Sequence, residues 1–196
     1  MIGDAGELPS TAQGTGPALP LTLITGTLAG GADMYAILIT DFASFSAAGV
    51  SSFDSQLFLF DSGGNGVYSN DDTGGAGTPG TLPSGHPFGP THNGLYYLAF
   101  SAFNYDPISS GGRIFPDFLV VPGSLGIYGP TGPGGGSAIT GWTDPNSASG
   151  AYSIVLTGAL PIAMLMWQVS QKRNAGPPGT ASRGDSRAMP SNPVPC

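Results

Sequence analysis

"FDSQLFLFDSGGNGVYSNDD", residues 53–72, decides the expected fold class of this chain. Leucine and phenylalanine alternate over residues 57–60, which is the period-two pattern of a β-strand. The Asn-Gly dipeptide at 65–66 is a strong hairpin signal, and an aspartate such as Asp61 is suited to open a turn. The stretch therefore predicts a strand, a tight turn and a second short strand, followed by two adjacent aspartates.

Alternation of β-branched and aromatic residues between glycines recurs along the chain. It predicts further strands at residues 21–26, 33–40, 94–106 and 150–158. In the most regular of these, 94–106, one face would carry Tyr96, Leu98, Phe100 and Ala102, and the other Tyr97, Ala99 and Ser101. Repeated short strands between glycines indicate an all-β domain.

Glycine and proline shape the connections between these strands. The chain has 33 glycines and 19 prolines, together about a quarter of its 196 residues, a share that favours loops or disorder. Hydrophobic residues make up 40%, which is enough to form a core. Long loops are expected at 73–94, 104–117 and 129–150, and loops of this length in a compact domain are usually functional or mobile.

The character of the sequence changes near residue 160, which divides the chain into a β-domain at 1–160 and a C-terminal region at 161–196. The apolar run "LPIAMLMWQV" at 160–169 is too short to span a bilayer, which needs about 20 residues, so no membrane span is expected. The Gly, Pro and Ser-rich remainder predicts a disordered tail.

Charge is distributed unevenly along the chain. Residues 1–160 contain eleven acids and one base, Arg113, a net charge of 1 − 11 = −10. Residues 161–196 contain four bases and one acid, a net charge of +3, and the two sum to −7. An acidic body repels phosphate backbones, which excludes nucleic acid as an expected partner. Because it has one base, most of its carboxylates must be solvated, cap backbone amides or bind cations.

The sequence also gives information on the cellular location of the protein. Cys196 is the only cysteine, so no internal disulfide can form and cysteine usage does not indicate a redox compartment. The opening "MIGDAGELPS" has neither the basic start nor the apolar run of a leader. The scarcity of lysine and the polar Gly, Ser, Thr and Asn content favour a secreted or cell-surface protein over a cytoplasmic one, with a leader absent from this sequence.

Five short motifs follow one another in a familiar order. They are "DAGELPSTAQ" (4–13), "GTLAGGADMYAILIT" (26–40), "FDSQLFLFDSGGNGVYSNDD" (53–72), "GLYYLAFSAFNYD" (94–106) and "SGAYSIVLTG" (149–158). This succession resembles the bacterial pre-peptidase C-terminal domain family over about residues 4–158. The resemblance implies an antiparallel, jelly-roll-like β-sandwich of secreted or surface proteins, without catalytic activity. This chain departs from the family in its longer loops and in having no attached peptidase.

Carboxylates without an obvious counter-charge lead to a hypothesis about a metal. Asp71 and Asp72 are adjacent, follow Asn70, and have no base nearby in sequence, so they must be solvated or bound to a cation. The resemblance places Asp4 and Glu7 in the segment that holds calcium in some collagen-binding relatives. We expect calcium as the cofactor, with ligands drawn from Asp4, Glu7, Asp33, Asp71 and Asp72. The alternative is a solvated acidic rim.

The sequence offers little for catalysis. The only histidines, His86 and His92, lie in a Gly/Pro-rich loop, and no Gly-x-Ser-x-Gly elbow occurs. The same two histidines lack the cysteines that usually complete a structural zinc site. We therefore expect no catalytic residues and no enzyme.

These observations favour a non-catalytic module with a binding or structural role and an extracellular protein or polysaccharide as partner. Two other functions remain open. A carbohydrate-binding module would need exposed aromatic rings, for which Tyr105 and Trp142 are the loop candidates. A subunit of an extracellular assembly, which would include self-assembly, would need an open apolar surface or an unpaired strand edge.

Overall fold

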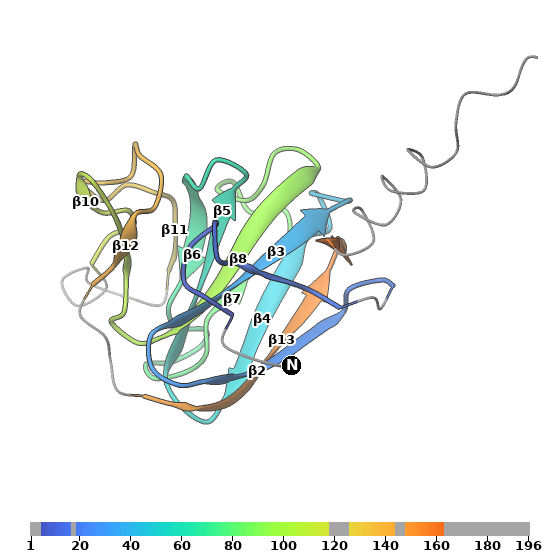
Figure 1. The fold of residues 1–196 in the computed structure, drawn as a ribbon, viewed down its shortest axis with the longest axis horizontal. Coiled ribbons are helices and arrows are strands. Elements are labelled where there is room, and N and C mark those ends of the chain that lie inside the picture. Colours follow the sequence, from blue (N-terminus) through green and yellow to red (C-terminus); the bar gives the residue numbers. More distant parts are fainter. Residues whose placement is uncertain (1–4, 17–18, 118–125, 144–147, 163–196) are drawn as a thin grey trace, which may run out of the picture.

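A computed structural model describes residues 5–16, 19–117, 126–143 and 148–162. Within these residues the chain is all-β, as the sequence predicts, and its strands form three sheets (Figure 1). The predicted C-terminal tail lies outside the described residues from residue 163 onward, as does Asp4. The described residues contain no helix long and apolar enough to cross a membrane.

The central sheet has seven strands, in the order β1-β3-β8-β5-β6-β11, and β14 also pairs with β3. These strands are β1 (Gln13–Gly14), β3 (Ala32–Ile39), β5 (Ser55–Asp61), β6 (Gly66–Asn70), β8 (Gly94–Ala102), β11 (Ile127–Tyr128) and β14 (Ala159–Pro161). All pairings in this sheet are antiparallel except that of β1 with β3. The hairpin expected at residues 53–72 is thus confirmed as β5 and β6.

A second sheet has four strands, in the order β2-β13-β4-β7. They are β2 (Leu23–Leu28), β13 (Gly150–Thr157), β4 (Ser46–Ser51) and β7 (Thr81–Leu82). This sheet packs against one face of the central sheet, with a core between them that includes Tyr35, Ile37, Ile39, Leu57, Leu59, Leu98, Phe100, Ile154 and Leu156. The two facing sheets give a β-sandwich-like architecture.

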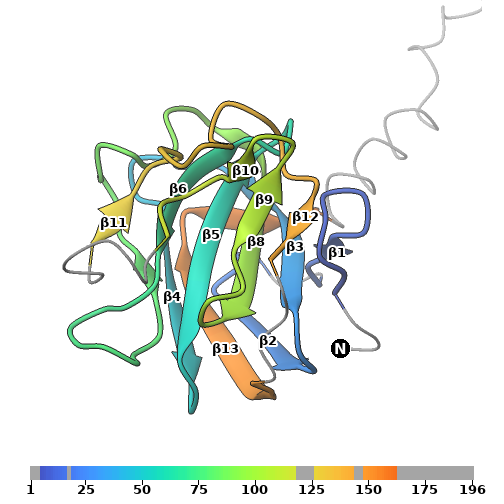
Figure 2. The ribbon, with the colours of Figure 1, turned by 90° about the vertical axis from the view of Figure 1, so that its left-hand side faces the viewer.

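A third, small sheet covers the other face of the central sheet. It consists of β9 (Pro107–Ser109), β10 (Gly112–Arg113) and β12 (Gly141–Trp142), and Figure 2 shows it in front of β5 and β8. Its packing buries a second core that includes Met34, Phe58, Phe60, Ala99, Ile114, Phe115 and Trp142. The segments 104–117 and 129–150, expected as loops, therefore contain short strands. Two or three residues are too few for an alternating pattern to reveal a strand in sequence.

A buried polar chain links the two large sheets. The Tyr152 hydroxyl donates to Asp33 Oδ2 at 2.5 Å and lies 2.5 Å from the Tyr35 hydroxyl. The Tyr152 ring stacks on Phe100 with 4.1 Å between the centroids, and a Cβ at Gly26 would come within 2.5 Å of this ring. Burial, and then the neighbouring Tyr35, raises the pKa of Tyr152 well above its ordinary value, so its hydroxyl stays protonated and can donate.

We expect the substitution Tyr152→Phe to destabilise the fold by about 1–3 kcal/mol, because it leaves the buried Asp33 carboxylate without this donor. Urea unfolding at pH 7 measures the change, with Tyr97→Phe, whose ring is only half-buried, as the matched control. Equal midpoints for the two variants would contradict the proposed importance of this link.

Candidate functional site

The site lies where the β5–β6 hairpin begins and ends. The register places Leu57 opposite Asn70 and Phe58 opposite Ser69. If this register is extended by one residue beyond Asn70, Asp71 lies opposite Gln56. Both then lie on the face of the central sheet that the third sheet covers. Gln56 in turn lies opposite Ser101 of β8. A short row of polar residues thus crosses three strands in a region that is otherwise apolar.

Asn70 organises the loop that follows β6. Its side chain is 1% exposed, and its amide donates to the carbonyl oxygens of Asp72 at 3.0 Å and Gly126 at 2.9 Å. Its own side-chain oxygen accepts from the Thr73 hydroxyl at 2.9 Å and from the Thr81 backbone amide at 2.6 Å. Asn70 therefore stabilises the loop.

A second set of bonds closes the loop over residues 72–78. Asp72 Oδ1 accepts from the Thr78 backbone amide at 2.9 Å, and the Thr78 hydroxyl donates to the carbonyl oxygens of Thr73 and Gly75 at 2.8 and 2.7 Å. Asp72 is 3% exposed, so one of its oxygens has a structural role in a buried position. These bonds hold the backbone on both sides of Asp71 in place.

Asp71 is the unusual residue of the cluster. It is fully buried, and neither of its carboxylate oxygens has a hydrogen-bond partner. Gln56 is the adjacent amide, but its Nε2 donates to Asp106 Oδ1 at 3.3 Å. The Ser69 hydroxyl and Asp54 Oδ1 are also buried without a partner. A buried polar atom without a partner costs about 1–3 kcal/mol, and more if it is charged, so this cluster needs an explanation.

The electrostatics of the cluster follow from this burial. Burial raises the pKa of Asp71 to about 8, with further contributions from the charges of Asp72, Asp54 and Asp106, while Gln56 opposes the rise. Burial and the Asp72 charge also raise the pKa of Asp54 to about 6. The negative charges thus disfavour ionisation of one another, and a bound proton or a bound cation would relieve the repulsion.

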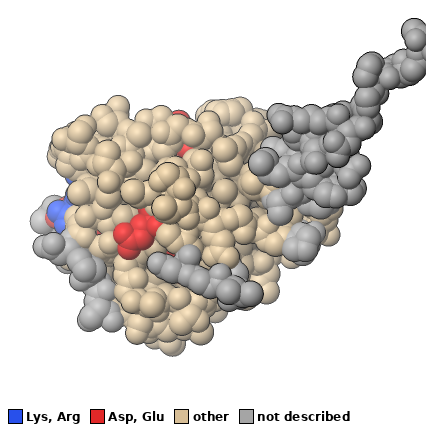
Figure 3. All heavy atoms as spheres, in the orientation of Figure 1, with Lys and Arg blue, Asp and Glu red and all other residues tan. Residues whose placement is uncertain are grey.

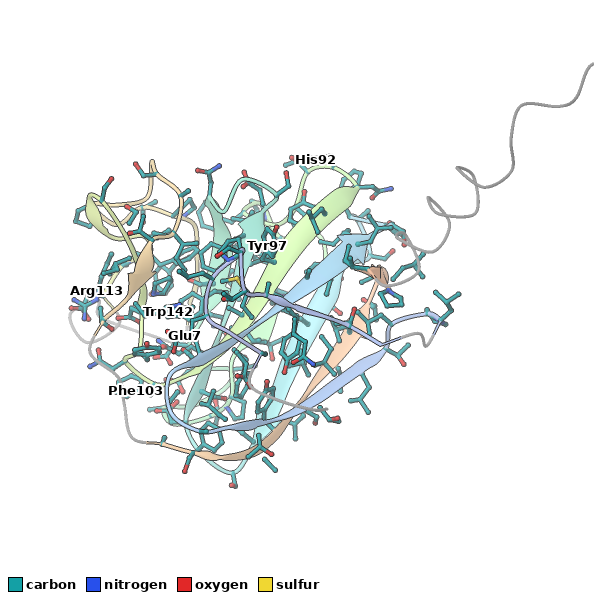
Figure 4. All side chains as sticks on the ribbon, viewed as in Figure 1. Glu7, His92, Tyr97, Phe103, Arg113 and Trp142 are labelled. Carbon is teal, nitrogen blue, oxygen red and sulfur yellow. The ribbon has the colours of Figure 1, made fainter. Side chains whose placement is uncertain are left out.

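Asp106 belongs to the same region but has a counter-charge. Arg113 Nε donates to Asp106 Oδ2 at 2.9 Å, and Arg113 Nη1 lies 3.0 Å from Asp117 Oδ2. Burial raises the pKa of Asp106, and Arg113 opposes the rise. Arg113 is the only Lys or Arg among the described residues, and Figure 4 shows it at the edge of the molecule, beyond Trp142. Both of its ion pairs are with carboxylates other than Asp71.

The structure describes four of the five predicted calcium ligands and places them in different parts of the fold. Asp71 and Asp72 share the cluster, and both are buried, so the expectation of a solvated acidic rim is wrong for them. Glu7 Oε1 accepts from the Ala32 backbone amide at 3.2 Å and from the Tyr105 hydroxyl at 3.1 Å. Asp33 lies between the two large sheets, where it accepts from Tyr152. Asp4 lies outside the described residues.

Sequence reasoning missed three members of the cluster: Asp54, Gln56 and Asp106. The first two could have been found, because a hairpin that pairs residue 57 with residue 70 brings residues 54–56 beside residues 71–73. Asp106 could not, because its place depends on the packing of the third sheet against the central one. Within the described residues, no group of three or more Asp, Glu, His or Cys side chains is arranged to hold a metal ion.

The other candidate residues are engaged elsewhere. His86 packs against the rings of Tyr68 and Phe88, and His92 packs against Tyr96. Figure 4 shows His92 at the top of the domain, apart from Glu7 and Trp142 on its left side. A surface cavity of about 420 Å³ is lined by Asn104, Ile108, Arg113, Trp142 and Thr143.

The two candidate sugar-binding rings, Tyr105 and Trp142, stack on each other with 5.3 Å between the centroids. They are 6% and 9% exposed, so they do not form an open platform. Trp142 is fixed further by Nε1, which donates to the Glu7 carbonyl oxygen at 2.8 Å.

Comparison with family models, curated proteins and solved structures finds no match to this chain. The chemistry of its residues therefore carries the functional argument.

We expect the substitution Asp71→Asn to stabilise the metal-free protein increasingly as the pH rises. The folded-state pKa of Asp71 is raised from 3.8 to about 8, so the stability that its protonated form provides is complete below about pH 4 and is lost as the pH rises through 8. The variant should match the parent near pH 4 and exceed it by a few kcal/mol, to order of magnitude, at pH 9.

Urea unfolding in chelator at pH 4, 7 and 9 measures this difference. Asp41→Asn, which removes a carboxylate from an exposed turn, is the control. Parallel profiles for the parent and Asp71→Asn would contradict the assignment.

Proposed function

We propose that this chain is a non-catalytic β-sandwich module of a secreted or cell-surface protein, with a binding or structural role, and that calcium stabilises its fold. The observation that carries the calcium proposal is Asp71, a fully buried carboxylate with both oxygens unpartnered, next to the unpartnered Asp54 Oδ1. An ionised carboxylate is not left in this state without a large cost, and a divalent cation removes that cost.

The donors available favour calcium over a transition metal. The cluster offers only oxygen atoms: the carboxylates of Asp71 and Asp54, the free oxygen of Asp72, and the Gln56 amide oxygen. Calcium accepts six to eight oxygen ligands in flexible geometry, including amide and backbone carbonyl oxygens and water. It therefore does not require a third acidic side chain in the first coordination sphere. Asp71 and Asp54 would hold the ion, with other oxygens completing the sphere.

The resemblance to the pre-peptidase C-terminal family supports the module assignment through the location of its motifs. The motifs at 26–40, 53–72, 94–106 and 149–158 contain the whole of β3, β5, β6, β8 and β13, which are five strands of the two facing sheets. A jelly-roll-like sandwich without an active site is what the resemblance implies. The aromatic and backbone contacts of His86 and His92 support a non-catalytic role.

Thermal unfolding of the chain in millimolar calcium, compared with excess chelator, tests the proposal. A ligand that binds only the folded state stabilises it by about 2.7 kcal/mol at 100 times its dissociation constant, so the melting temperature should rise with calcium. Asp71→Asn should lose this rise, and Asp41→Asn should keep it. Magnesium, which prefers octahedral geometry and retains its waters, should give a smaller rise.

If calcium leaves the melting temperature of the parent protein unchanged, the proposal of a bound cation is wrong. A calcium-dependent rise that survives Asp71→Asn would place the ion elsewhere. The segment that contains Glu7, which the family resemblance indicates, would then be tested by Glu7→Gln.

A further inference from the structure

The four-stranded sheet carries no charge. None of the residues of β2, β4, β7 and β13 is Asp, Glu, Lys or Arg. This is unusual in a chain with a net charge of −7, since surface strands normally include charged residues on the solvent side. In Figure 3 the described atoms of the lower right part, where this sheet lies, are neither red nor blue.

The outer face of this sheet also exposes large apolar side chains. Leu23 of β2 and Val155 of β13 lie directly opposite each other and are 53% and 48% exposed. Val50 of β4, opposite Ser153, is 54% exposed. These three are half of the six exposed large hydrophobic residues in the described chain.

In the part of the chain that the structure describes, the edge of the sheet at β2 is open. Among the described residues β2 pairs only with β13, whereas the corresponding edge strand of the central sheet, β3, is covered by β1 and β14. The sequence of β2, "LITGTL", has no lysine, no proline and no bulge, which are the usual devices that prevent an edge from pairing. Its outward side chains, Leu23, Thr25 and Thr27, are exposed and uncharged.

We propose that two copies of this chain associate through their β2 edges, antiparallel about a two-fold axis, to form one continuous eight-stranded sheet. A two-fold contact brings the same surface of both copies together, so like charges meet unless the surface is neutral. In an acidic chain, the uncharged edge at β2 is where a second copy can approach without that repulsion. A basic partner, in contrast, would be drawn to surfaces that carry carboxylates.

The geometry limits how the strands can pair. Residues that lie directly opposite each other in an antiparallel pair point to the same face of the sheet. The two-fold axis must therefore pass between the two copies of one residue, so that this residue lies opposite its own equivalent in the other copy. With the axis at Thr25, Leu23 of each copy lies opposite Thr27 of the other. This pairing satisfies the open backbone groups of β2 and covers part of the exposed Leu23 side chains.

Sedimentation of the full-length protein over a range of concentrations tests the proposal. A reducing agent is included because Cys196 could otherwise join two copies by a disulfide. The parent protein should shift from monomer to dimer mass as its concentration rises. Thr25→Lys should remain monomeric, because it sets two lysines close together across the axis. Val50→Lys, on the same face but two strands from the edge, should still form dimers.

Amide hydrogen exchange locates the contact in the same samples. The β2 amides that face the open edge, and not those bonded to β13, should become protected with rising concentration in the parent and in Val50→Lys, but not in Thr25→Lys. A parent that stays monomeric at every concentration overturns the proposal. Protection of these edge-facing amides in the monomer overturns it too, since another part of the chain would then cover this edge. Loss of the dimer in Val50→Lys would overturn edge pairing in favour of stacked faces.

The dimer is independent of the proposed calcium site. Measurement in calcium and again in chelator keeps the two questions separate, since dimerisation at β2 requires no cation. Failure of the calcium effect would leave the dimer result intact, and the reverse also holds.

Discussion

The burial of β5 on both faces is the constraint on which the rest of the structure depends. Every residue of this strand from Ser55 to Phe60 is buried, because the four-stranded sheet covers one face and the third sheet covers the other. Leu57 and Leu59 enter one core, and Phe58 and Phe60 enter the second. A strand of this kind leaves no solvent-facing side for polar residues, so Gln56 must find its partners inside the protein.

The polar cluster follows from this burial. Gln56 accepts from the Ser101 hydroxyl and donates to Asp106, both at 3.3 Å, which uses both ends of its amide. Asp71, beside it in the continued register, has no hydrogen-bond partner at either carboxylate oxygen. Arg113, the only Lys or Arg among the described residues, bonds to Asp106 and Asp117. Asp71 is therefore a buried carboxylate without a partner or a counter-charge of its own, which is the physical basis for a proton or a cation at this residue.

The predictability of the site varied with the kind of contact involved. Asp61 could be assigned from sequence, since it accepts from the backbone amides of Gly63 and Asn65, as a turn-opening aspartate should. Asp71 and Asp72 were recognisable as carboxylates without a base, but their burial was not, because adjacent polar residues after a hairpin are usually exposed. Glu7 was grouped with them by resemblance, and Asp33 was included among the same predicted ligands. In the structure, Glu7 instead accepts a hydrogen bond from the Tyr105 hydroxyl, and Asp33 accepts one from the Tyr152 hydroxyl.

The sequence by itself determined the all-β class, the long strands and the hairpin, because period-two alternation and Asn-Gly turns are local properties that need no knowledge of distant residues. It also determined the charge imbalance, which indicates carboxylates that need solvent, a proton or a cation. Only the tertiary structure decided that the third sheet covers the second face of β5, and hence that Asp71 is buried. It likewise decided that the uncharged β2 ends its sheet. Both depend on which segments meet in space, and in this chain those segments are too short or too far apart in sequence to leave a local pattern.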